Sequence, residues 1–327
     1  MRRTLLALLT VFATAGQVVA ATVPVPKTAA GSHRVAFAFH SAFLMNLHHF
    51  LYNMAVNKEK LAAVEWQSAP APDELVSLNK AIGFYRAHYA ALGIREDPAM
   101  VRIKQALSVE DGRRDVTGLG LQPALAGVLG EVGPIYARTI WPLHDKTNQI
   151  WIARVNKLDM AFGAEIHAGI EGHLEGRFPR SPVRTDVVFD TGSRQGAYTD
   201  EQIVIPSGRV SYQDLASLEM LYHEASHTSV TEPLEAAIDA RLKATGRGDG
   251  DDLWHVVQFY TVGEVTRDVL ARHGEAGYRP YADKRELYSG YWAPYMPVIT
   301  TIWRDHMTGK IKLQAAVQQM VDGLPRQ

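Results

Sequence analysis

The sequence predicts an α+β fold that is predominantly helical, with a small sheet in the C-terminal half. In the first half, apolar residues recur at helical spacing from Val35 to about Gly176. In the second half, two β-branched segments bounded by Gly, Pro and Asp, 181–190 and 196–208, indicate strands. Further segments with helical spacing follow these strands, so we expect a zincin-like part with a small sheet beside a helical N-terminal part.

The composition narrows the class of protein. The chain has 327 residues, 46% of them hydrophobic, and a formal net charge of -1, as in an ordinary globular protein. Because no strong charge imbalance exists, we expect no nucleic-acid partner. The chain has no cysteine, so any metal must be held by histidine and carboxylate side chains. Such ligands suit zinc (Zn2+) in a site with an open position.

The first residues have the pattern of a secretory signal peptide. Arg2 and Arg3 precede a short apolar segment that ends in small residues around Ala20 and Ala21. We therefore expect residues 1–21 to be removed on export to the periplasm or the medium. The apolar segment is too short for a permanent membrane span, and we expect none in the mature chain.

Residues 22–180 are expected to form the helical N-terminal part. The sequence predicts a buried helix from Val35 to about Lys60 and an amphipathic helix over 73–92. Asp97 followed by Pro98 predicts a capped helix start. Two or three further helices are expected up to residue 176, with an interruption near Gly133-Pro134.

Residues 181–327 are expected to form the zincin-like part. After the two strands, helices are predicted over 211–230, 232–244 and 253–273, and Gly274 should end the last of these.

The clearest functional signal is H-E-x-x-H at His223, Glu224 and His227. Positions i and i+4 lie one turn apart on the same face of a helix, so both imidazoles can reach one cation. Glu224 would project beside that cation, where it can act as general base toward a water activated by zinc. The alternative to a metal site is a surface helix whose His and Glu side chains are merely solvated.

A zinc site needs a third protein ligand. A third histidine at the position typical of H-E-x-x-H-x-x-G-x-x-H is absent, because Pro233 stands there. A later helix offers Glu264, with Asp268 four positions further on and on the same face. His255 is the alternative ligand, although nine residues before Glu264 it should lie near the opposite helix face.

These two elements together resemble the gluzincin metallopeptidases, the thermolysin-like clan, in which H-E-x-x-H is followed by E-x-x-x-D. The resemblance covers roughly residues 183–274, and Gly263 stands where the thermolysin group has Asn. It implies His223, His227 and Glu264 as zinc ligands, Glu224 as general base, and Asp268 as a residue that orients one ligand histidine.

Three further features bear on such a site. The segment 196–208 stands where gluzincins have an edge strand that pairs with an extended substrate, although it can equally be a plain sheet strand. A donor for the oxyanion can come from an aromatic C-terminal segment. Its candidates are Tyr278, Arg279, Tyr281, Tyr288 and Tyr291. The remaining histidines of interest are His40, His48, His49 and His144. A second metal site or the lining of the substrate cleft are alternatives, but we expect hydrogen-bonded residues of buried helices.

The sequence therefore favours an exported zinc-dependent hydrolase, most of all a metallopeptidase whose two parts enclose a cleft above the metal. Its substrate would be a peptide or another amide, including a cell-wall amide. The alternative from another class is a periplasmic metal-binding or scaffold protein that keeps the site without turnover.

Overall fold

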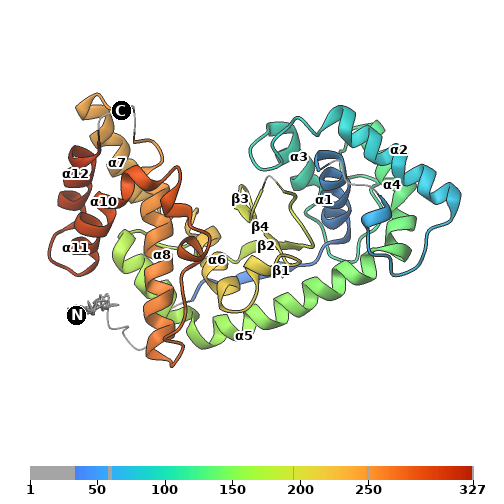
Figure 1. Cartoon of the computed structure of the whole chain (residues 1–327). Helices are drawn as coiled ribbons and strands as arrows, with labels where there is room; N and C mark the ends of the chain where they lie inside the picture. Colours follow the sequence, from blue (N-terminus) through green and yellow to red (C-terminus); the bar gives the residue numbers. More distant parts are fainter. Residues whose placement is uncertain (1–33, 58–60, 194, 249, 326–327) are drawn as a thin grey trace, which may run out of the picture.

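A four-stranded sheet lies at the centre of the molecule, between two groups of helices (Figure 1). The computed structural model describes residues 34–57, 61–193, 195–248 and 250–325. Most of these residues are helical, which confirms the predicted α+β class with predominant helix and a small sheet. The predicted signal peptide lies outside the described residues.

The sheet mixes parallel and antiparallel pairs. Its strands are β1 (Phe37–His40), β2 (Val183–Val188), β3 (Tyr198–Thr199) and β4 (Ile203–Pro206), in the spatial order β1-β2-β4-β3. β2 pairs in parallel with both β1 and β4, whereas β3 pairs antiparallel with β4 and forms one edge of the sheet. The registers place Phe37 opposite Val183, Thr185 opposite Ile203, and Ile203 opposite Thr199.

Successive side chains of a strand point to opposite faces of the sheet. In the central strands, the side chains on each face are buried in a different core. Val187, Ile203 and Ile205 belong to the core that includes the C-terminal helices. Val188 and Val204 belong to a second core, formed with the N-terminal helices. The sheet therefore joins two cores, which explains why β4, with the sequence IVIP, is apolar and buried along its whole length.

One predicted helix begins later than expected. The segment from Val35 was predicted as helix, but Phe37–His40 forms β1, and helix α1 spans Phe43–Val56. Every residue of α1 is buried, as predicted. A short buried strand and a buried helix have the same apolar character, and only pairing with β2, far along the chain, distinguishes them.

The N-terminal helices pack around α1. They are α2 (Pro72–His88), α3 (Pro98–Leu107) and α4 (Pro123–Thr139). The predicted cap of α3 is confirmed: the Oδ1 atom of Asp97 accepts hydrogen bonds from the first free backbone N–H groups, including that of Ala99 at 2.8 Å. A short 3-10 turn, Leu61–Ala63, precedes α2.

The interruption predicted at Gly133-Pro134 is wrong. Helix α4 continues through Pro134 to Thr139, and the break falls at Ile140. A proline inside a helix removes one backbone hydrogen bond, but the buried residues Val132 and Tyr136 on either side keep this turn packed.

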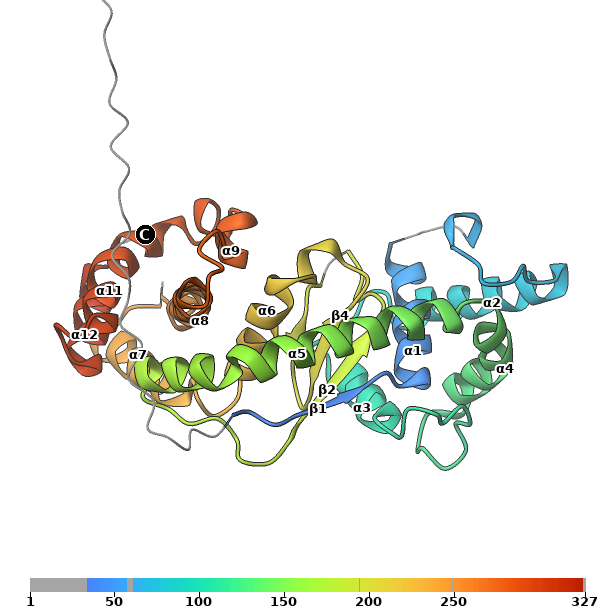
Figure 2. The ribbon, with the colours of Figure 1, turned by 90° about the horizontal axis from the view of Figure 1, so that it is seen from below.

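Helix α5 (Trp141–Leu174) runs along most of the molecule (Figure 2). Its 34 residues correspond to a length of about 50 Å. Trp141 at its start belongs to the N-terminal core, whereas Trp151 and Val155 belong to the core of the C-terminal helices. The two cores consequently do not separate at residue 180, since much of α5 packs against α6 and α8.

The C-terminal part contains the three predicted helices, α6 (Leu215–Ser226), α7 (Glu232–Thr245) and α8 (Leu253–Arg272). Gly274, in a left-handed conformation with φ of 95°, follows the end of α8 as predicted. Short helical segments and one longer helix complete the chain: Val210–Tyr212, α9 (Tyr281–Lys284), Leu287–Ser289, Ala293–Tyr295, α10 (Met296–Val298), the π-helical Ile299–Trp303, α11 (Arg304–Met307) and α12 (Leu313–Gly323).

Among the described residues, no helix combines the length and the apolar character that crossing a membrane requires.

Candidate metal centre

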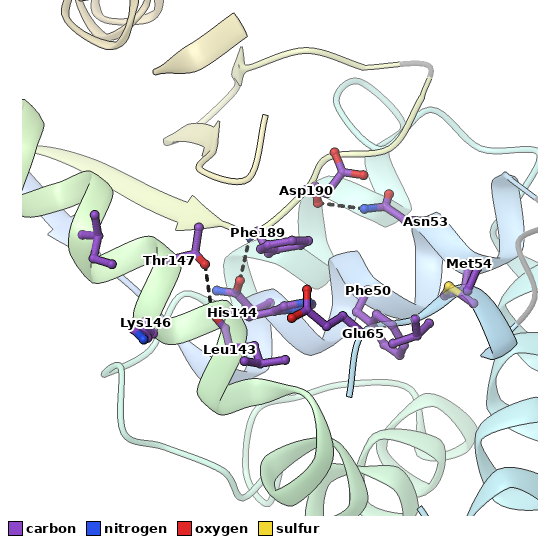
Figure 3. Close-up of a pocket in the computed structure, with 14 residues that line it drawn as sticks. Phe50, Asn53, Met54, Glu65, Leu143, His144, Lys146, Thr147, Phe189 and Asp190 are labelled. Carbon is purple, nitrogen blue, oxygen red and sulfur yellow. Dashed lines mark hydrogen bonds between the residues drawn. The ribbon is translucent and has the colours of Figure 1, made fainter. Parts of the chain in front are cut away.

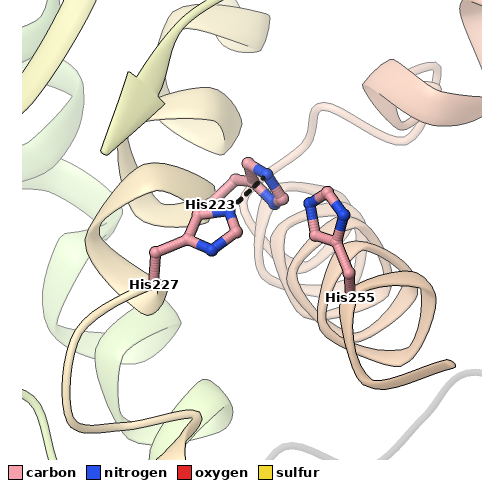
Figure 4. Close-up of side chains that lie close together, drawn as sticks. All are labelled: His223, His227 and His255. Atoms are coloured by element: carbon pink, nitrogen blue, oxygen red, sulfur yellow. Dashed lines mark hydrogen bonds between the residues drawn. The ribbon is translucent and has the colours of Figure 1, made fainter. Parts of the chain in front are cut away.

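Three histidine side chains converge between α6 and α8 (Figure 4). His223 and His227 come from α6 and its C-terminal cap, and His255 comes from the first turn of α8. One ring nitrogen from each lies within 4.8 Å of the others. In the part of the chain that the structure describes, this is the one group of three or more His, Asp or Glu side chains with such spacing.

The two motif histidines have the separation expected of two ligands on one ion. Their Nε2 atoms lie 3.2 Å apart, as Figure 4 shows with a dashed line. Two nitrogens bound tetrahedrally to zinc at 2.0–2.1 Å would be about 3.3 Å apart. Without an ion, the same distance allows one neutral ring to donate a hydrogen bond to the other. The donor set therefore fits zinc with a fourth position left for another ligand.

His255, in the first turn of α8, completes the group with His223 and His227. Its Nδ1 atom lies 3.8 Å from Oδ1 of Asp252, three residues earlier, and this proximity lowers the pKa of the Asp252 carboxyl. Asp252 is in turn fixed by the indole N–H of Trp292, which donates to Oδ2 at 2.5 Å. With Nδ1 turned toward a carboxylate, Nε2 of His255 is the nitrogen free to bind a cation.

Glu264 and Asp268 lie elsewhere on α8. Glu264 follows His255 by nine residues, which corresponds to about 13 Å along the helix axis. Its Oε2 atom accepts a hydrogen bond from Arg267 at 2.6 Å, and Arg267 also lies 3.5 Å from Asp268. The structure thus brings His255, and not Glu264, to the two motif histidines.

The crossing of α6 and α8 explains this outcome. At Gly263, next to Glu264, an added Cβ atom would lie 3.4 Å from Oε1 of Glu219, one turn before His223 on α6. The start of α8 therefore faces the end of α6, and the middle of α8 faces an earlier turn of α6. Which of the two candidate ligands meets His223 depends on this antiparallel crossing, which no local sequence pattern encodes.

Burial keeps the motif histidines neutral. It lowers the pKa of His223 well below its usual value, and it lowers the pKa of His227 to about 3. A neutral imidazole offers the lone pair that a metal needs. The ring of His223 is held by packing on Phe259, with ring centroids 3.8 Å apart, and its buried Nδ1 has no hydrogen-bond partner in the described part of the chain.

Glu224 lies beside the histidines and is 3% exposed. Burial raises the pKa of its carboxyl to about 8, against the opposing effect of a hydrogen bond from Thr199. The Oγ1 atom of Thr199 lies 2.9 Å from both Oε2 and the carbonyl oxygen of Glu224. A carboxyl group with a pKa near neutrality can both accept and return a proton.

A cleft of about 750 Å³ opens over the candidate ligands. Its lining includes His223, His227 and His255 from α6 and α8, and Arg95 from the connection between α2 and α3. Edge strand β3 also lines it. The sequence predicted a cleft enclosed by both halves of the chain, and the lining residues agree with that prediction.

Of the five oxyanion-donor candidates, Tyr281 alone is among the residues that line this cleft. Its hydroxyl oxygen lies 3.4 Å from that of Tyr212, a second lining residue that was not predicted from the sequence. The hydroxyl of Tyr278 donates instead to buried Glu219, and Tyr291 is 79% exposed.

Asp252 and Thr199 were not among the site residues predicted from the sequence. The three-residue spacing of Asp252 and His255 could have indicated that pair, because such residues share a helix face. No sequence signal links Thr199 to Glu224, since the contact depends on how β3 packs against α6.

The N-terminal histidines occupy a different environment. His48 and His49 are buried and hydrogen-bonded, as predicted. Their partners are Tyr85 for His48 and Tyr198 for His49. His40 bonds Asp111 at 2.8 Å.

His144 borders a second pocket, of about 480 Å³, between α1 and α5 (Figure 3). There it stacks on Phe189 with ring centroids 4.0 Å apart and bonds the hydroxyl of Tyr136. The side chain of His144 thus has the packing role that the sequence predicted.

The fold and site together define a predominantly helical α+β protein with a three-histidine candidate metal centre in a cleft. Comparisons of the chain with protein-family models, curated proteins and solved structures found no match. The resemblance to gluzincins consequently rests on the motif residues alone and stays a prediction.

Proposed function

We propose that this protein is a zinc-dependent hydrolase of the metallopeptidase type, with His223, His227 and His255 as metal ligands and Glu224 as general base. The observation that carries the proposal is the convergence of three imidazole nitrogens beside a buried carboxyl group in an open cleft. His255 takes the place that the gluzincin resemblance gave to Glu264.

Three neutral imidazoles are a ligand set that suits zinc and leaves one position open. A zinc ion bound there would act as a Lewis acid toward a carbonyl oxygen and make a water molecule more acidic. Asp252 would support this set by holding the orientation of His255, as carboxylates commonly do for ligand histidines.

Glu224 would accept the proton of the attacking water and then donate it to the leaving amine. Its carboxyl lies next in sequence to a proposed ligand but outside the ligand set, so it remains free for proton transfer. Tyr281 would donate a hydrogen bond to the oxygen that becomes negatively charged when the carbonyl is attacked.

Edge strand β3 supports a peptide substrate. It is one of the two edge strands of the sheet, and its residues Tyr198 and Thr199 line the cleft. An extended peptide can pair with the free edge of such a strand and place an amide bond over the site. A different amide that fits the same cleft, including one from a cell wall, is the second substrate class. The pattern of residues 1–21 supports export before the protein acts.

Metal analysis of variants tests the ligand set. Purified mature protein, His255→Ala and Glu264→Ala would be loaded with zinc and dialysed, and bound zinc would be measured by atomic emission. We expect wild type and Glu264→Ala to retain about one zinc per chain and His255→Ala to lose it. Loss of zinc in Glu264→Ala with retention in His255→Ala would restore the carboxylate ligand implied by the gluzincin resemblance and contradict our assignment.

Glu224→Gln separates an enzyme from a metal-binding scaffold. The amide keeps the size of the side chain but cannot accept the proton, so we expect hydrolysis of a peptide library to fall by about 100-fold or more, with zinc still bound. If zinc-loaded wild type cleaves neither peptide, amide nor ester substrates, the scaffold function replaces the hydrolase.

A further inference from the structure

Thr199 on strand β3 contacts the proposed general base directly. Its single hydroxyl proton faces both the side-chain Oε2 and the main-chain oxygen of Glu224, each at 2.9 Å. These two acceptors belong to one residue of α6. The contact therefore fixes the carboxyl relative to the helix that carries His223 and His227.

The neighbouring residue of β3 is held from the opposite side. Successive strand residues point to opposite faces, so Tyr198 points away from the face that Thr199 occupies. Tyr198 is 2% exposed and belongs to the N-terminal core. Its hydroxyl lies 2.8 Å from Nε2 of His49 on α1. The Nδ1 atom of His49 lies 2.9 Å from the carbonyl oxygen of Met45, which can only accept, so Nδ1 carries the proton and Tyr198 donates to Nε2.

A buried ion pair holds the end of the same strand. Asp200 follows β3 directly and pairs with Lys104 of α3, whose side chain is 1% exposed. The ammonium group of Lys104 also lies 4.4 Å from the centre of the Tyr198 ring, a cation–π distance. A buried cation is retained only where such partners compensate the loss of water. Both residues that flank Thr199 are thus bonded to N-terminal helices, Tyr198 to α1 and Asp200 to α3.

We propose that β3 is a positioning element: Thr199 orients the carboxyl of Glu224, and the N-terminal helices hold Thr199 in place through Tyr198 and Asp200. The catalytic meaning of this inference rests on the proposed function, in which Glu224 is the general base. Thr199 is accordingly a positioning residue rather than a catalytic one. The helical N-terminal part then does more than line the cleft, since it sets the orientation of the Glu224 carboxyl on α6.

The hydrogen bond itself can be tested without any catalysis. Thr199→Val, Glu224→Ala and the double variant would be unfolded in urea with metal removed, and their unfolding constants compared. If the two side chains interact, the double change should differ from the product of the single changes by about fivefold. Agreement within about 1.5-fold would overturn the proposed orientation of Glu224. Repeating the cycle in a Tyr198→Phe background should reduce the coupling to below about twofold, and an undiminished coupling would refute the role of the N-terminal helices.

Thr139→Val is the matched control. Thr139 is a buried threonine of α4 whose hydroxyl donates to the carbonyl oxygen of Ile135 at 2.7 Å, and it does not line the cleft. It should show no coupling with Glu224→Ala.

Kinetics test the consequence. In zinc-loaded protein we expect Thr199→Val to lower kcat about tenfold with KM changed less than about twofold, and Thr199→Ser to restore kcat to within about threefold of wild type. Unchanged kcat in Thr199→Val, with wild-type turnover present, would overturn the positioning role. If wild type shows no turnover, the proposed function fails, whereas the unfolding cycle still decides whether Thr199 holds Glu224.

Discussion

Two clusters of histidines in this chain differ in their spacing along the sequence and in their bonding. His48 and His49 on α1 are adjacent, and their rings bond different elements: His48 bonds Tyr85 of α2 and His49 bonds Tyr198 of β3. His223 and His227 are four residues apart, and their Nε2 atoms face each other at 3.2 Å. Consecutive helix residues diverge, whereas residues four apart share a face.

The difference shows why His49 is a packing residue and not a candidate ligand. Both nitrogens of His49 have a protein partner, the Met45 carbonyl oxygen and the Tyr198 hydroxyl, so neither is left for a cation. In the C-terminal cluster, the closest partner of one imidazole nitrogen is another imidazole nitrogen. Burial alone does not separate the two, because His49 and His223 are both almost completely buried.

The largest contrast is expected in zinc affinity. His227→Ala should weaken zinc binding by more than about 100-fold, because even residues that only support a ligand contribute about 10–100-fold. His49→Ala should leave zinc affinity within about twofold but lower the free energy of unfolding by about 2 kcal/mol, through lost packing and hydrogen bonds. Competition with a chromophoric chelator measures the first quantity and urea unfolding the second. Equal losses of zinc affinity in the two variants would abolish the distinction between the clusters.

The free energy of unfolding should depend on pH through the protonation of His49. Burial is the main cause that lowers the pKa of this imidazole to about 4, below the unfolded value of 6.5. Between these values the unfolded state binds more protons, so stability falls as the pH is lowered from about 6.5 to about 4. His49 should account for about 3 kcal/mol of that loss. In His49→Gln this contribution should vanish, as seen by urea unfolding in the presence of a chelator; an identical slope in the variant would contradict the assignment.

The smallest effects are expected from the residues that support each cluster. Asp252→Asn should weaken zinc binding by about tenfold, because the neutral amide no longer attracts the Nδ1–H of His255. Tyr198→Phe, the corresponding change beside His49, should lower the free energy of unfolding by about 1 kcal/mol and leave zinc affinity unchanged. Isothermal titration with zinc and urea unfolding would measure both variants. A loss of zinc affinity in Tyr198→Phe as large as that in Asp252→Asn would show that the clusters are coupled.

The local features of the fold followed from the sequence. The capped start of α3 at Asp97, the stop of α8 at Gly274 and the strands near 183–188 and 203–206 depend on neighbouring residues, and the structure contains them. The first strand did not follow, because Phe37–His40 becomes a strand only by pairing with Val183–Val188. The continuity of α4 through Pro134 likewise depends on packing against other helices.

The candidate site divides in the same way. The sequence by itself determined that His223 and His227 share one helix face with Glu224 beside them, because the pitch of an α-helix fixes neighbours four residues apart. Only the tertiary structure decided that His255, rather than Glu264, meets them, since that choice depends on where two helices distant in sequence cross. It also decided that Thr199 contacts Glu224, because strand β3 is brought to α6 by contacts with residues more than 90 positions away, at Lys104 and His49.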